Sequence, residues 1–234
     1  MNFRNIINLS RRYFIEGGRK DITTFFIVTL IIAFIGFIQP MGRVSDSFMA
    51  FVLFIMSVLY AGRTFSIFQP VSKTIHYLTI PASTAEKTLF NACLVYLYYN
   101  ALLIAALFLG TTISELIHKL MSSDYNFQLY FPFDWSDLLS LLTLESVFLF
   151  GSIYFKTHPV AKTLLSLMVI MIFFFILDTS IFGHYMNSLS PEKMMHLNKS
   201  MEEATINHYA YGFCIVVFVF FNFMTWLRLR ETEA

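Results

Sequence analysis

Four polar residues lie near the middle of long apolar segments, where a side chain that binds a proton or a hydrogen-bond partner is unusual. Glu145 is at the centre of one segment, and Tyr96, Tyr99 and Asn100 are near the centre of another. A carboxylate at the middle of a bilayer costs roughly 2.5 to 3.5 kcal/mol on insertion scales, so we expect Glu145 to face the protein interior and meet a donor. Either a protonated Glu145 joins two helices through a hydrogen bond to a Tyr or Asn, or these residues line a path for a substrate or proton.

The segments that must position these residues resemble membrane spans. The chain of 234 residues is 57% hydrophobic and 13% charged, whereas soluble domains carry about a quarter charged residues. Its apolar runs approach the length that crosses a hydrocarbon core of about 30 Å. We therefore expect an all-α integral membrane protein, a single transmembrane domain over residues 1–234 with six transmembrane helices. The expected spans are about 22–38, 46–61, 88–109, 136–154, 163–181 and 209–227.

The second of these segments, 46–61, is short, and a re-entrant segment there would leave five transmembrane helices. The basic residues favour six. With six spans, twelve of the sixteen Lys and Arg residues fall on one side, which the positive-inside rule assigns to the cytosol together with both termini. These twelve are Arg4, Arg11, Arg12, Arg19, Lys20, Arg63, Lys73, Lys87, Lys156, Lys162, Arg228 and Arg230. The other four are Arg43, Lys119, Lys193 and Lys199.

The N-terminal stretch, residues 1–20, has helical periodicity, with apolar side chains on one stripe and basic or amide side chains on the other. This pattern is typical of an amphipathic helix that lies in the membrane interface and contacts lipid. The helix could serve only as a membrane anchor, or it could also be a mechanical link to a partner, and both roles fit this pattern. Asp21 is expected to cap the first span, and Pro40 to follow its end.

The loop Thr64–Lys87 ends in a recognisable helix start. Ser83 and Glu86 have the S-x-x-E spacing of a capping box, in which each side chain accepts a hydrogen bond from the backbone amide of the other residue. The helix that begins there should continue without a break into the third span. From Ser83 to Leu109 it would be roughly 40 Å long, so its first turns would project into the cytosol.

The phrase LTIPASTAEK at 78–87 resembles the "LPAS…EK" loop of bacterial ABC transporter permeases of the type-2 exporter superfamily, particularly those of the Bacteroidetes. Six helices and an amphipathic N-terminal helix are similar to that family over nearly the whole chain. The resemblance implies a permease in the bacterial inner membrane that dimerises with a second copy or homologue and is driven by a separate ATPase. The chain has no Gly-Lys dipeptide and hence no phosphate-binding loop of its own, so we expect no enzyme activity here and a cytosolic ATP-binding subunit as partner.

The segment 71–87 is the expected contact for that subunit, because a capped helix continuous with a span is stiff enough to transmit force. Its charged, aromatic and apolar side chains would provide the binding surface. The candidates are Lys73, Ile75, His76, Tyr77, Leu78, Glu86 and Lys87. Tyr77 and Leu78 are expected to contribute most, since a few aromatic or apolar anchors usually dominate an interface.

Other classes of function have less support in the sequence. A net charge of +1 gives no field for binding nucleic acid. Cys93 and Cys214 lie in apolar runs, and no metal-binding or cofactor-binding motif is present. An intramembrane enzyme acting on a lipid or prenyl substrate usually shows clustered acids or histidines, which are isolated here. A non-transporting assembly or sensor subunit remains a third alternative.

Overall fold

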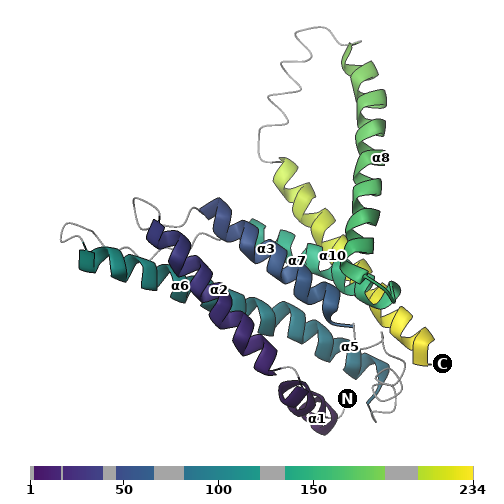
Figure 1. Ribbon diagram of the computed structural model, residues 1–234. Helices are drawn as coiled ribbons and strands as arrows, with labels where there is room; N and C mark the ends of the chain where they lie inside the picture. Colours follow the sequence, from purple (N-terminus) through teal and green to yellow (C-terminus); the bar gives the residue numbers. More distant parts are fainter. Residues whose placement is uncertain are drawn as a thin grey trace.

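The computed structural model describes residues 3–16, 18–38, 46–65, 82–121, 135–187 and 205–233 (Figure 1). The regular elements in these ranges are all helices. In chain order they are α1 (Phe3–Glu16), α2 (Gly18–Ile38), α3 (Asp46–Arg63), α5 (Thr84–Cys93), η2 (Leu94–Tyr99), α6 (Asn100–Met121), α7 (Trp135–Tyr154), α8 (Pro159–Asn187) and α10 (Thr205–Glu233).

Five helices of the described chain are long and apolar enough to cross a membrane. They are Gly18–Ile38, Thr84–Met121, Ser136–Tyr154, Pro159–Leu177 and Tyr211–Thr232. The described part of the chain is therefore all-helical, with the composition of a membrane protein, as expected. The second expected span coincides with the shorter apolar helix α3, whose 18 residues extend about 27 Å.

Several helices extend beyond the apolar runs that predicted them. The helix around the expected span 88–109 begins at Thr84 and continues to Met121, so the segment 110–121, expected as the start of an outer loop, is helical. Helix α8 likewise covers Pro159–Asn187 where the expected span was 163–181. Backbone hydrogen bonds and caps determine where a helix ends. In both helices the backbone hydrogen bonds continue into residues where the hydropathy has already fallen.

Two helix pairs form the body of the molecule. Helix α2 packs along α6, α7 packs along α10, and α3 lies against α7. The first apolar core lies between α2, α3, α6 and α7. It consists of Val28, Ile32, Met49, Leu53, Leu103, Ala106, Leu107 and Leu141. Gly110 makes the α2–α6 approach possible, because a Cβ atom there would lie 2.8 Å from the Thr29 carbonyl oxygen.

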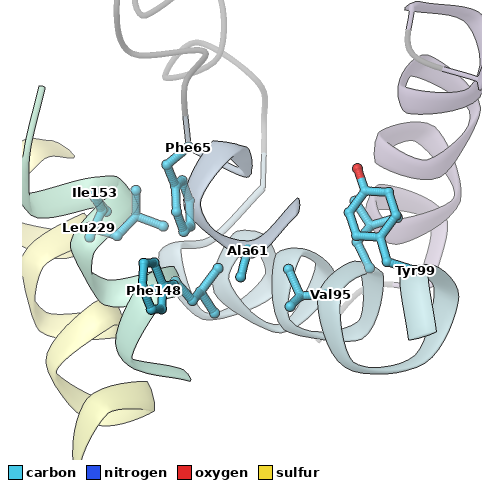
Figure 2. Close-up of a cluster of buried hydrophobic side chains, with 9 residues drawn as sticks. Ala61, Phe65, Val95, Tyr99, Phe148, Ile153 and Leu229 are labelled. Atoms are coloured by element: carbon cyan, nitrogen blue, oxygen red, sulfur yellow. The ribbon is translucent and has the colours of Figure 1, made fainter. Parts of the chain in front are cut away.

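The second core joins α3, η2, α7 and α10 (Figure 2). Its members are Ala61, Phe65, Leu94, Val95, Tyr99, Phe148, Leu149, Ile153 and Leu229. The polar residues described below lie between and beside these two cores.

Helix α8 is attached mainly through its first turns. Val160 contacts Gly62 of α3, and Thr163 contacts Gly151 of α7, so closely that a larger residue at either glycine would collide. Beyond these contacts α8 stands away from the other helices (Figure 1). The apolar side chains of residues 168–177 are exposed. The turn before it places His158 at φ 51°, a left-handed conformation.

Candidate functional site

The helix that carries most of the candidate residues starts at the predicted capping box. The Ser83 amide donates to Glu86 Oε2 at 3.0 Å, and the Glu86 amide donates to Ser83 Oγ at 3.2 Å. From this cap, α5, η2 and α6 continue as one helix of 38 residues, Thr84–Met121. At 1.5 Å per residue this is about 57 Å, well beyond the thickness of a hydrocarbon core. The predicted helix start and its continuity with the third apolar segment are confirmed.

The helix widens in its middle, at Leu94–Tyr99, into a π-helix. In this form each amide bonds to the carbonyl five residues earlier, so the segment holds about one residue more than the same length of α-helix. Such turns are rare and frequently occur at functional sites. The segment has the sequence LVYLYY, so three tyrosines are displayed around a single widened turn. The sequence analysis did not anticipate this feature.

Glu145 of α7 lies in the protein interior, next to Asn100, the residue that follows the widened turn. Its side chain is 1% exposed, and Asn100 Nδ2 donates to Glu145 Oε2 at 3.1 Å. Ser57 Oγ donates to Asn100 Oδ1 at 3.0 Å. The expected meeting of Glu145 and Asn100 is present, and Ser57 extends it to a polar contact that joins α3, α6 and α7.

Tyr96 points to a different neighbour from Asn100. Its hydroxyl donates to Asn222 Oδ1 of α10 at 2.9 Å, and its ring lies 5.1 Å from that of Phe218. Asn222 in turn donates from Nδ2 to the Phe218 carbonyl at 2.8 Å within its own helix. The second bond fixes the orientation of the amide that receives Tyr96.

Tyr99 points toward α1 and α2, on the side of the helix that faces the N-terminus. Its hydroxyl is hydrogen-bonded to that of Tyr13, which donates to Asp21 Oδ2 at 2.7 Å. Since Tyr13 has one hydroxyl proton and gives it to Asp21, Tyr99 is the donor in the other bond. The Tyr99 ring also stacks on Tyr60, with centroids 4.1 Å apart. Figure 2 shows the Tyr99 hydroxyl at the edge of the second core, directed away from its apolar members.

Burial and the neighbouring Asp21 carboxyl raise the pKa of Tyr13 above its ordinary value, so it remains a neutral donor. Asp21 was expected to cap the first span. That expectation is wrong, because α2 begins at Gly18 and Asp21 lies in its first turn. The carboxyl instead connects the N-terminal helix to the bundle.

The four residues expected to form a path therefore divide between three contacts. Asn100 and Glu145 meet, Tyr96 bonds to α10, and Tyr99 bonds to α1. The sequence analysis missed the partners Ser57, Asn222, Tyr13 and Asp21. Asn222 could have been noticed as a lone amide in the run VVFVFFNFM, whereas the pairing of Tyr13 with Asp21 depends on how α1 folds back.

Among the residues expected to dock an ATPase, Lys73, Ile75, His76, Tyr77 and Leu78 lie outside the described residues. Glu86 and Lys87 are described, and they are only 5% and 2% exposed. The expectation that these two offer exposed charged groups to a partner is therefore wrong. Glu86 is engaged in the capping box, and α5 packs against α1 and α10.

The chemistry available around residues 96–100 is that of hydrogen bonds and of two carboxyl groups, Glu145 and Asp21. Within the described ranges, no group of three His, Cys, Asp or Glu side chains could hold a metal ion. Comparisons of the chain with protein-family models, with curated proteins and with solved structures find no match.

Proposed function

We propose that this chain is the membrane-spanning permease subunit of an ABC-type exporter, driven by a separate ATP-binding subunit. In this proposal α3 is the second of six spans, both termini are cytosolic, and α1 lies in the interface of a bacterial inner membrane. The permease pairs with a second copy or a homologue. The twelve basic residues on one side and the resemblance of LTIPASTAEK to the permease loop support this arrangement.

The observation that carries the proposal is the continuous 38-residue helix with a capped start. ATP hydrolysis in one polypeptide can move another only through an element that does not bend at the point of contact. The capping box stabilises the first turn of this helix, typically by about 1 kcal/mol. Movement at Ser83 would then reach the polar centre at residues 96–100, roughly 20 to 25 Å along the same helix.

The proposed contact is the segment before that cap, with Tyr77 and Leu78 as its anchors. Since Glu86 and Lys87 are buried, the binding energy in this proposal comes from residues 71–81. The two buried residues lie on α5, which packs against α1 and α10, and their replacement should disturb the permease itself.

Co-purification with a candidate ATP-binding subunit tests the proposal. Tyr77→Ala and Leu78→Ala are expected to lose the subunit in a detergent pull-down, while Lys119→Ala, an exposed position at the far end of the same helix, should retain it. Retention of the subunit by both loop variants at the level of Lys119→Ala would contradict the docking assignment. Failure of the natural chain to capture any ATP-binding subunit would contradict the exporter function itself.

A further inference from the structure

Seven consecutive residues, 94–100, connect the long helix to four other helices. Tyr96 bonds to α10, Tyr99 bonds to α1, and Asn100 joins α3 and α7. The widened turn lies at the centre of these contacts. A change in its geometry would therefore be transmitted in several directions at once.

The π-helical conformation is unfavourable for the backbone of residues 94–99. A regular α-helix runs on both sides of it, and an isolated segment of this composition would continue that α-helix. Unfavourable local geometry persists where the surrounding structure determines it, so contacts to the segment must stabilise the π form.

Tyr13 of α1 spans the turn. Its ring makes an edge contact with Phe90, which precedes the turn, at a centroid distance of 6.5 Å. It makes similar contacts with Tyr98 and Tyr99 inside the turn, at 6.2 and 6.4 Å. Its hydroxyl completes the chain of hydrogen bonds from Tyr99 to Asp21. One side chain of α1 thus contacts α5 before the π segment and the last two residues of the segment itself, and it links them to α2.

Closure of the wide turn would have a defined geometric result. Because the number of residues is fixed, conversion of the π turn to α-helix must rotate one flanking part about the helix axis by the angle of one residue, about 100°. The short α5, whose 10 residues pack against α1 and α10, is the part that turns once α1 is released, since α6 stays packed along α2. The rotation would move Cys93, now exposed, to a different side of the helix.

We propose that Tyr13 is a clamp that holds residues 94–99 in the π form, so that release of α1 closes the turn and rotates α5 about its axis. The membrane-surface helix α1 thereby controls the orientation of the capped helix start. This device belongs to the chain alone and goes beyond the proposed transport function. It can be tested without an ATP-binding subunit.

The test is a distance measurement by pulsed electron paramagnetic resonance on the full chain in lipid nanodiscs. Spin labels are attached to the native Cys93 and to Ser140→Cys, an exposed position on α7, with Cys214→Ser as background. A helix with side chains is 10–12 Å across, so a rotation of about 100° moves a side-chain position by about 8 Å. Tyr13→Phe is expected to shift the distance distribution by several ångströms toward a second population.

Tyr154→Phe is the matched control, because it removes a tyrosine hydroxyl from an exposed position on α7. It should leave the distribution unchanged. If Tyr13→Phe also leaves it unchanged, or if both variants shift it equally, the clamp is refuted.

Deletion of Leu97 gives the decisive second comparison. Leu97 is 67% exposed, and its removal takes out the extra residue of the turn while both flanking helices keep their orientation. In this background Tyr13→Phe should no longer shift the Cys93 distance, because no wide turn is left to close. A shift of the same size with Leu97 deleted would show that Tyr13 acts by another route and overturn the proposal. If the deletion variant is not monodisperse on gel filtration, the comparison of Tyr13→Phe with Tyr154→Phe still decides the matter.

Discussion

Replacement of Glu145 tests whether the buried carboxyl serves mainly to join α6 and α7. Glu145→Leu fills the same space but removes the acceptor of the Asn100 amide. That amide also donates to the Tyr96 carbonyl at 3.2 Å, so it is not left without a partner. The expected loss is therefore that of one hydrogen bond between membrane helices, on the order of 1 kcal/mol in the free energy of unfolding.

Glu145→Gln should be tolerated, because the glutamine side chain has the same shape and keeps an acceptor for Asn100. We expect its free energy of unfolding to lie within about 0.5 kcal/mol of the natural chain, a fraction of the single interhelical bond that it preserves. The measurement is equilibrium unfolding in mixed micelles with increasing sodium dodecyl sulfate, followed by circular dichroism.

A double-mutant cycle isolates the bond itself. Glu145→Leu and Asn100→Ala, alone and together, should give a coupling energy of about 0.6 to 1.7 kcal/mol. Ser146→Ala is the matched control, because Ser146 is buried beside Glu145 in the sequence and its hydroxyl donates to the Thr143 carbonyl of its own helix, at 2.7 Å. It should show no coupling to Asn100. Equal coupling for both positions, or none for Glu145, would refute the joining role.

Glu145→Gln also separates a structural role of Glu145 from a role in transport. If the proposed transport uses the Glu145 proton, Glu145→Gln will unfold like the natural chain but fail to transport in reconstituted vesicles. Equal transport by the two proteins would remove the proton path and leave the joining role.

Three further predictions follow from local contacts. Ser83→Ala should destabilise the helix start by about 1 kcal/mol and speed hydrogen exchange at residues 84–87, whereas unchanged exchange would contradict the role of the cap. Gly110→Ala should lower the free energy of unfolding by about 1 to 3 kcal/mol, because the added Cβ meets a backbone oxygen of α2. Gly212→Ala is the control and should be neutral or stabilising, since a Cβ there has nothing within 4 Å, and equal effects of the two substitutions would refute the close crossing of α2 and α6. Nanodiscs that contain phosphatidylglycerol should stabilise the natural chain more than neutral nanodiscs do. Arg11→Ala, at an exposed position of α1, should reduce this gain in stability by about 1 kcal/mol. An unaltered gain would count against contact of α1 with anionic headgroups.

Local patterns in the sequence predicted local structure well. The capping box at Ser83 depends on residues three apart, and both of its hydrogen bonds are present. The approach of Glu145 to Asn100 followed from their equal depth in neighbouring apolar segments. Spacing specifies both partners of the capping box, whereas depth alone left the partner of Glu145 open between a Tyr and an Asn.

Features that depend on tertiary contacts could not be predicted in this way. Residues of the π turn at 94–99 contact neighbours from α1, α3 and α10, and no local residue type requires the turn. Lys87 looked like an exposed cation, but it is buried on α5, which packs against α1 and α10. Helix α6 continues to Met121 past the apolar run, because its backbone bonds do not depend on hydropathy.

The way α8 is attached has a mechanical consequence. Its contacts at Gly62 and Gly151 act as a pivot near one end of a rod of 29 residues, about 43 Å long. A tilt of only about 10° at this pivot displaces the far end by roughly 7 Å, since 43 Å multiplied by the sine of 10° is about that length. Lipid tails are as apolar as the side chains they surround, so the bilayer offers little resistance to such a swing. Motion of α3 and α7 by a fraction of a helix diameter would therefore be amplified into a large rearrangement at the opposite end of α8.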